Sequence, residues 1–332
     1  MRIAVLGAGQ MGSAFGAPAV ERGHDLVYWG PDWIDGPALE ALAGGEPHPD
    51  LQVSLPKPVE TASGIGEAVH DADLIALAVV SEGAEWVSEE ATKRAPEDAP
   101  VLVFTKGLVE KSGEDIVPAV VRAHEIFGPG RPIVGVGGPV KAIDLINASP
   151  TQTVFASPER ERAREAADAF STPYYFPGAT DDLLGLGLCA ALKNCYAIAF
   201  GLLSGREAKP NLRALAFGTA LGELGNIVSA AGGRPETAAG AAGSGDLYVT
   251  CLSGRNGDFG RLLNEGNTPE EAREKMGNAT VEGLGTLPPA LALAKSLDLS
   301  EEELPLLHHL DAVLRGERSA GEPEFARLLQ ER

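Results

Sequence analysis

Cysteine and histidine are both scarce in this chain of 332 residues, which contains three cysteines and six histidines. The cysteines are odd in number, and neither residue type shows metal-ligand or catalytic-triad spacing, so neither a metal site nor a disulfide framework is predicted. Two of the cysteines lie within an apolar helical pattern, and we expect reduced, packed thiols. The cysteines are Cys189, Cys195 and Cys251.

Long apolar runs and basic residues are also lacking. No run of about twenty apolar residues occurs, and the opening MRIAVLGAG predicts a strand and a turn rather than a cleavable leader. We therefore expect a cytoplasmic protein without membrane insertion. The 27 Lys and Arg against 47 Asp and Glu give a net charge of −20, which argues against nucleic acids and anionic membranes as partners, because both require a basic face. An anionic small molecule can still bind, because surface charges are screened beyond about 8 Å.

The pattern of the sequence changes near its middle. In the first half, short apolar runs bounded by turn residues alternate with helical segments, which is typical of parallel βαβ units with buried strands. The expected strands lie at residues 2–7, 25–30, 73–80, 101–105, 133–138 and 153–156. Long helical stretches follow at 181–205 and 211–233. We predict an α/β, Rossmann-like doubly wound domain over residues 1–180 and an all-α domain over residues 181–332.

The first predicted strand leads directly into GAGQMG, a G-x-G-x-x-G arrangement that is followed by a helical segment. In this motif the first glycine makes a tight turn, the second lets the backbone approach a pyrophosphate, and the third allows close helix packing. The motif predicts that residues 1–180 bind a dinucleotide. A flavin site, a plain nucleotide site and a ligand-free turn remain alternative interpretations. The residues concerned are Gly7, Gly9, Gln10, Met11 and Gly12.

The residue that distinguishes NAD from NADP is not evident after the second predicted strand. An acidic residue roughly twenty positions after the glycines holds the ribose of NAD, whereas an Arg accommodates the 2′-phosphate of NADP. This chain has Gly30 near the expected place and Asp32 just beyond it. Asp32 is interpreted either as a ribose ligand or as an ordinary turn residue. The expected cofactor is therefore NAD or NADP, with the preference open.

Further polar clusters follow the predicted strands and continue through the helical half. They are TKGL (105–108), GGP (137–139), ALKN (191–194), GSGDLYVTC (243–251), SGRNGDFG (253–260) and VEG (281–283). In this order and spacing they resemble the soluble, NAD(P)-dependent glycerol-3-phosphate dehydrogenases of archaea and bacteria. The resemblance implies reversible hydride transfer between NAD(P)H and dihydroxyacetone phosphate, giving sn-glycerol 3-phosphate for phospholipid backbones. It also implies a helical substrate and catalytic domain with the C-terminal architecture of 6-phosphogluconate dehydrogenase, and a homodimer is one option for assembly.

The resemblance assigns roles to individual residues. Lys193 matches the catalytic lysine of the family, Lys106 matches a second active-site lysine, and Asp246 matches the acid beside the catalytic lysine. Arg255 and Asn256 match a phosphate-binding pair. The other implied substrate contacts are Lys106, Asn194 and Gly138, and the implied cofactor contacts outside the glycine-rich motif are Gly30, Ser81, Lys106, Arg255 and Glu282.

The chemistry of a ketone reduction is consistent with these roles. Hydride addition leaves negative charge on oxygen, so a cation and a proton donor must already be in place, and Lys193 can supply both. The always-charged fork of Arg255 suits phosphate oxygens. Asp246 would offset the desolvation of an ammonium within the apolar stretch CAALKNCYAIAF. The simpler interpretations are a lysine whose head reaches water, a solvated turn and a turn-capping carboxylate.

The chain departs from the family pattern at two positions. Gly187 stands where a Glu is usual, and Thr219 stands where an Arg is usual in the next long helix. We interpret the joint change as the exchange of one supporting pair for another arrangement. Two alternative hypotheses remain: a related dehydrogenase acting on another small phosphorylated or carboxylated alcohol, and a non-catalytic dinucleotide-binding protein.

Overall fold

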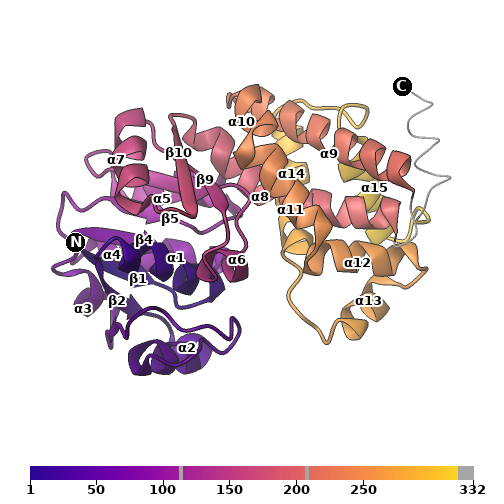
Figure 1. Ribbon diagram of the computed structural model, residues 1–332. Helices are drawn as coiled ribbons and strands as arrows, with labels where there is room; N and C mark the ends of the chain where they lie inside the picture. Colours follow the sequence, from indigo (N-terminus) through magenta and orange to yellow (C-terminus); the bar gives the residue numbers. More distant parts are fainter. Residues whose placement is uncertain (112–114, 206–208, 321–332) are drawn as a thin grey trace. The chain divides into compact units, whose positions relative to one another are not determined.

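A computed structural model describes residues 1–111, 115–205 and 209–320 (Figure 1). Spatial contacts divide the chain into two compact units. The first unit comprises Met1–Lys106 and Val117–Gly187, and the second comprises Gly107–Ile116 and Leu188–Arg332. A domain boundary between residues 180 and 181 stays a prediction.

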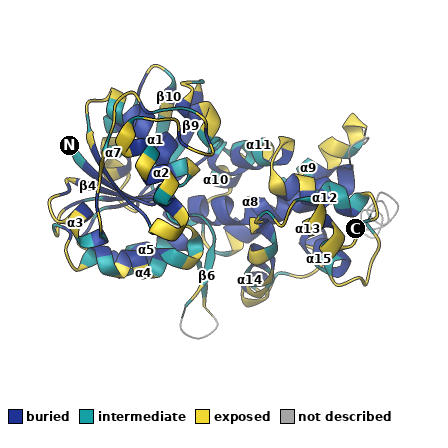
Figure 2. Cartoon of the chain, turned by 90° about the horizontal axis from the view of Figure 1, so that it is seen from below, coloured by how far each residue is buried: buried dark blue, intermediate teal, exposed yellow. Residues whose placement is uncertain are grey.

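An eight-stranded sheet forms the centre of the first unit, and its central strands are buried (Figure 2). The strands are β1 (Arg2–Leu6), β2 (Asp25–Trp29), β3 (Glu60–Thr61), β4 (Leu74–Leu77), β5 (Val101–Val103), β8 (Ile133–Gly137), β9 (Thr151–Ala156) and β10 (Tyr175–Thr180). Their order is β10-β9-β8-β5-β4-β1-β2-β3, and the pairs are parallel except β8 with β9. All six predicted strands are present, and the α/β Rossmann-like fold is confirmed.

The sequence pattern does not predict two features of this sheet. β10 contains Pro177 and Gly178, which weaken a strand signal. It forms the edge of the sheet and pairs only with β9, where a proline is tolerated. β9 runs antiparallel to β8, although the alternating pattern predicts parallel units throughout. The connection between these strands holds only the short helix α6 (Ala142–Ile146) instead of a full crossover helix.

Helices cover both faces of the sheet. Besides α6, the helices of the first unit are α1 (Gln10–Glu21), α2 (Asp32–Gly44), α3 (Ile65–Val69), α4 (Ser81–Thr92), α5 (Ala119–Phe127) and α7 (Arg160–Phe170). In Figure 2, α1 and α7 lie on one face and α4 and α5 on the other. The ring of Phe15 in α1 lies 4.6 Å from the ring of Phe104 and 4.7 Å from that of Phe170. This aromatic packing fixes α1, and with it the preceding glycine-rich turn, against the sheet.

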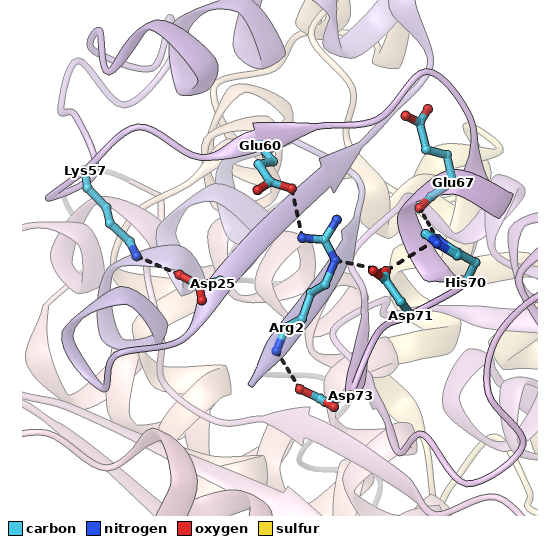
Figure 3. A network of polar contacts seen from close by, with 8 residues as sticks. All are labelled: Arg2, Asp25, Lys57, Glu60, Glu67, His70, Asp71 and Asp73. Atoms are coloured by element: carbon cyan, nitrogen blue, oxygen red, sulfur yellow. Dashed lines mark hydrogen bonds and ion pairs between the residues drawn. The ribbon is translucent and has the colours of Figure 1, made fainter.

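The amino ends of the strands carry a network of ion pairs (Figure 3). Arg2, which begins β1, contacts Glu60 at 2.8 Å and Asp71 at 2.9 Å. Lys57 contacts Asp25, which begins β2, at 2.9 Å. β1 and β2 are parallel, so this network lies at the amino ends of the strands, whereas the glycine-rich turn follows the carboxyl end of β1. Arg2 and Lys57 are therefore paired with carboxylates at the end of the strands away from that turn.

The second unit consists mainly of helices, which confirms the predicted all-α half. They are α8 (Leu183–Ser204), which begins in the first unit, α9 (Pro210–Ala230), α10 (Pro235–Ala239), the π-helical turn η1 (Ala241–Gly245), α11 (Asp246–Leu252), α12 (Arg255–Asn264), α13 (Pro269–Lys275), α14 (Glu282–Ser296) and α15 (Pro305–Leu314). The strands β6 (Leu108–Glu110) and β7 (Ile116–Pro118) form a small second sheet, and β6 packs on α14. Gly232 closes α9 with a φ of 90°.

Among the described residues, α8 is the one helix whose length and composition would allow it to span a membrane. However, 89% of its 18-residue apolar window is buried inside the protein, as in a core helix.

The glycines in the first turns of α8 are explained by packing. A Cβ on Gly185 would lie 2.1 Å from Oδ2 of Asp182, whose Oδ1 accepts the Gly185 N–H at 2.9 Å. A Cβ on Gly187 would lie 2.6 Å from the side chain of Pro118.

Candidate active site

The glycine-rich turn between β1 and α1 has the geometry that a pyrophosphate requires. Gly7 adopts a φ of 109°, and a Cβ there would lie 2.7 Å from the carbonyl oxygen of Ala78. A Cβ on Gly12 would lie 2.3 Å from the carbonyl oxygen of Gly7, so only glycine lets α1 begin this close to β1. In contrast, no atom lies within 4 Å of a Cβ position on Gly9. Gly9 is the N-cap of α1 without a capping side chain, so the first N–H groups of the helix are available to an anion.

Both backbone polar groups of Ala8, within this turn, are held by side chains from later in the chain. Asp35 accepts the Ala8 N–H at 3.0 Å, and Nε2 of His48 lies 3.0 Å from the Ala8 carbonyl oxygen. Nδ1 of His48 accepts hydrogen bonds from the N–H groups of Asp50 and Leu51, so the ring proton is on Nε2. Nε2 therefore donates the hydrogen bond to the Ala8 carbonyl oxygen. Burial raises the pKa of Asp35. The glycine-rich motif alone does not mark Asp35 or His48 as site residues, because they lie 27 and 40 positions after Ala8.

The other predicted site residues of the first unit follow the carboxyl end of a strand or begin the helix after it. Gln10 and Met11 begin α1, Gly30 follows β2, Asp32 begins α2, Ser81 begins α4 after β4, Lys106 follows β5, and Gly138 follows β8 with a φ of 105°. The backbone is fixed on both sides of Lys106. The Thr105 hydroxyl donates to the carbonyl of Val79 at 2.7 Å, and Gly107 has a φ of 125°. Ligands of doubly wound sheets bind outside the carboxyl ends of the strands.

In the second unit, Lys193 and Asp246 form a buried ion pair. Nζ of Lys193, in the middle of α8, donates a hydrogen bond to Oδ1 of Asp246 at the start of α11. The two side chains are 9% and 0% exposed. An ammonium with so little contact with water requires a partner of opposite charge. The structure thus brings together the lysine and the acid that the resemblance pairs.

A π-helical turn positions Asp246. The turn η1 leads straight into α11, and a Cβ on Gly243 would lie 2.1 Å from the carbonyl oxygen of Ala238, so this turn requires glycine. The Thr250 hydroxyl donates to the backbone carbonyl of Asp246 at 2.6 Å. Such π-helical turns occur frequently at functional sites. Here the turn directs a carboxylate toward α8.

Asn194, also on α8, belongs to a second polar network of this unit. Its Nδ2 donates to Oε2 of Glu282 at 2.8 Å, and its Oδ1 accepts from Nδ2 of Asn256 at 3.0 Å. Oδ1 of Asn256 in turn accepts the N–H of Gly283 at 2.9 Å. A guanidinium nitrogen of Arg255 lies 3.9 Å from Oε1 of Glu282, and both of these side chains are more than half exposed. Four of the predicted site residues, from α8, α12 and α14, therefore lie together.

Close backbone packing between α8 and α12 holds this network in place. A Cβ on Gly201 would lie 2.3 Å from the carbonyl oxygen of Gly257, and a Cβ on Gly260 would lie 2.1 Å from that of Ile198. The N-terminus of α12 follows Gly254, which has a φ of 134° and offers no capping side chain. The first N–H groups of α12 are therefore available to an anion.

The three cysteines are buried, as the sequence predicts. Burial raises the pKa of Cys251 to about 12, although Arg261 and Lys193 partly oppose this shift. Burial also raises the pKa of Cys195. Within residues 1–111, 115–205 and 209–320, no group of three or more His, Cys, Asp or Glu side chains is arranged to hold a metal ion.

The two positions that depart from the family pattern lie in different units. Gly187 packs against Pro118 and Val120 and leaves no space for a side chain, because a Cβ would lie 2.6 and 2.8 Å from them. Thr219 donates from its hydroxyl to the carbonyl of Leu215 at 3.0 Å. Neither residue carries a charge, and the exchange of one supporting pair for another arrangement stays a prediction.

Comparisons with known proteins agree over most of the chain. A family model described as NAD-dependent glycerol-3-phosphate dehydrogenase N-terminus matches residues 2–163, and the corresponding C-terminus model matches residues 182–323. The NADP(+)-dependent glycerol-3-phosphate dehydrogenase of Archaeoglobus fulgidus is 30% identical over 323 residues, covering 93% of this chain and 95% of that protein. The NAD(P)+ glycerol-3-phosphate dehydrogenase of Aromatoleum aromaticum is 33% identical over 322 residues, covering 96% and 94%. The crystal structure of glycerol-3-phosphate dehydrogenase from Coxiella burnetii shares the fold, with a TM-score of 0.84, 24% identity and coverage of 99% and 98%.

Proposed function

Because the chain belongs to the NAD-dependent glycerol-3-phosphate dehydrogenase family, we propose that it catalyses the reversible reduction of dihydroxyacetone phosphate to sn-glycerol 3-phosphate. In the reduction, one hydride from NADH or NADPH adds to the ketone carbon and one proton adds to its oxygen, leaving NAD+ or NADP+. The product is the backbone of glycerophospholipids. The observation that carries this proposal is the buried pair of Lys193 and Asp246, in the same unit as the Arg255 and Asn256 network.

Lys193 is the proposed acid of the reduction. The bound dinucleotide supplies the hydride. The ammonium of Lys193 offsets the negative charge that develops on the ketone oxygen and donates the proton to it. Asp246 fixes the direction of the ammonium and compensates its charge within the buried site. Losing one preorganised donor of this kind typically lowers the rate by about 10²- to 10³-fold.

Arg255 is the proposed anchor of the substrate phosphate. It lies in the first turn of α12, whose uncapped N-terminus also attracts anions. Its side chain is 55% exposed, and its contact with Glu282 at 3.9 Å is long for an ion pair, so the guanidinium can turn toward a phosphate. Asn256 and Asn194 orient each other and offer amide groups beside this anchor.

Steady-state kinetics with dihydroxyacetone phosphate test this function. Turnover is followed by the loss of reduced-nicotinamide absorbance with NADH and with NADPH. Arg255→Leu should raise the KM for dihydroxyacetone phosphate by about tenfold or more, because a charge-assisted contact is lost. Arg273→Leu, at an exposed position of α13, is the matched control and should leave KM unchanged. Absence of turnover with both cofactors would favour a non-catalytic dinucleotide-binding protein, and an unaltered KM in Arg255→Leu would remove the phosphate anchor.

A cytoplasmic location belongs to the same proposal. It is supported by the three buried cysteine thiols, which suit a reducing compartment, and by the burial of α8 inside the protein. The proposed partner is the small-molecule substrate. A homodimer stays a prediction, and analytical ultracentrifugation of the purified protein would test it.

A further inference from the structure

The carboxylate of Asp35 occupies the position that a side chain on Gly30 would take. A Cβ on Gly30 would lie 2.1 Å from Oδ2 of Asp35 and 2.7 Å from its Cβ. Gly30 is the first residue after β2, where dinucleotide-binding domains selective for NAD carry the acid that binds the ribose. Asp35 comes instead from the first turn of α2. It reaches the same point because Gly30 has no side chain.

The glycine-rich turn fixes the orientation of this carboxylate. Oδ2 of Asp35 accepts the Ala8 N–H at 3.0 Å, and the Asp35 N–H donates to the carbonyl of Pro31 at 2.7 Å. The residue is 8% exposed, so its side chain has little freedom to turn away. None of the residues that the structure describes donates a hydrogen bond to Oδ1. This second oxygen can therefore accept a hydroxyl group next to the pyrophosphate turn.

The chain around β2 has no cation to bind a 2′-phosphate. No Lys or Arg occurs between Arg22 and Lys57. The Arg22 side chain donates to the carbonyl of Ala169 at 3.3 Å, and Lys57 is paired at the amino end of β2. The first turns of α2 and α4, which follow β2 and β4, contribute the acids Asp32 and Glu82. This stretch of the chain therefore supplies acids but no Lys or Arg that could pair with a second phosphate.

We propose that Asp35 binds a ribose hydroxyl of the adenosine half of the dinucleotide and thereby makes this protein selective for NAD over NADP. A carboxylate accepts a strong hydrogen bond from a hydroxyl group. A 2′-phosphate would instead bring a like charge against a buried carboxylate, which is unfavourable without a compensating cation. The inference rests on the proposed function only in requiring that the protein binds a nicotinamide dinucleotide.

Equilibrium titrations with NADH and with NADPH, followed by nicotinamide fluorescence, test this selectivity. The wild-type protein should bind NADH at least about tenfold more tightly than NADPH. Asp35→Asn keeps an oxygen for the Ala8 N–H but removes the charge, and it should reduce the ratio of the two Kd values by about tenfold. Glu40→Gln, which removes an exposed carboxylate from the same helix, is the matched control and should change the ratio of the two Kd values by less than about twofold.

A purely structural role for Asp35 predicts a different result. Asp35→Asn would then weaken the binding of both dinucleotides equally, and this outcome, like equal affinities in the wild-type protein, would overturn the proposal. Gly30→Asp combined with Asp35→Gly returns the carboxylate to the end of β2. This variant should recover the preference for NADH, and it provides the test if Asp35→Asn does not fold. Binding of neither dinucleotide would overturn the proposed function as well, whereas tight NADPH binding with turnover of dihydroxyacetone phosphate would overturn the selectivity alone.

Discussion

Replacing Asp246 with asparagine should remove much of the stability of the protein. The side chains of Lys193 and Asp246 are 9% and 0% exposed, so Asp246→Asn leaves an ammonium away from water without its counter-charge. Removing one partner of a buried ion pair typically costs about 3–5 kcal/mol. The total free energy of unfolding of a domain is about 5–15 kcal/mol. The substitution is therefore expected to remove a large part of it.

Urea unfolding followed by circular dichroism measures this change in the wild type, Asp246→Asn, Lys193→Met and the double variant. The double variant has lost both charges of the pair, so it should be more stable than either single variant. Asp311→Asn is the matched control, because its partner Arg315 is 57% exposed, and it should change stability by at most about 1 kcal/mol. Equal stabilities of Asp246→Asn and this control would show that the pair is not held away from water.

Three further predictions concern the glycine-rich turn, the thiols and pH. Gly12→Ala should destabilise the protein by about 1–3 kcal/mol, because its Cβ would lie 2.3 Å from the carbonyl oxygen of Gly7. Gly9→Ala should instead cost at most about 1 kcal/mol, because it replaces only an N-cap glycine with free space around it, while weakening NADH binding, and thermal unfolding beside fluorescence titration separates the two effects. Cys251, whose pKa burial raises to about 12, should react with a thiol reagent at neutral pH only as the protein unfolds; rapid labelling of the folded protein would contradict its burial. Burial lowers the pKa of His24, so the folded state disfavours its protonated form, and stability should fall as the pH drops below the ordinary histidine value of about 6.5. His24→Gln should make the free energy of unfolding depend less on pH in this range. An unchanged pH dependence would show that His24 does not cause it.

The helices and strands with a clear local pattern of apolar residues could be predicted from the sequence. The apolar runs of β1 and β2 and the long stretches of α8 and α9 are all found where the pattern places them. β10 could not be predicted, because Pro177 and Gly178 are acceptable only at a sheet edge, and edge position depends on the whole topology. The assignment of Gly107–Ile116 to the second unit likewise depends on long-range packing that no local pattern shows.

The candidate site could be predicted only in part. Lys193 and Asp246 are 53 positions apart, and their pairing follows from the family resemblance rather than from any local pattern. The contacts of Asp35 and His48 with Ala8 depend on how α2 and the segment after it fold back onto the turn. One signal for Asp35 is nevertheless present in the sequence. Gly30 leaves the end of β2 without a side chain, and an acid follows five residues later.

Whether Lys193 carries the chemistry is decided by the kcat/KM for dihydroxyacetone phosphate of the double variant Lys193→Met, Asp246→Asn, measured beside its affinity for NADH. Because this variant has lost both charges of the buried pair, it should fold and bind NADH as the wild type does. Without the ammonium, kcat/KM should fall by at least about 10²-fold. A double variant that binds NADH normally and still reduces the substrate within about tenfold of the wild-type rate would contradict the role of Lys193 as the acid.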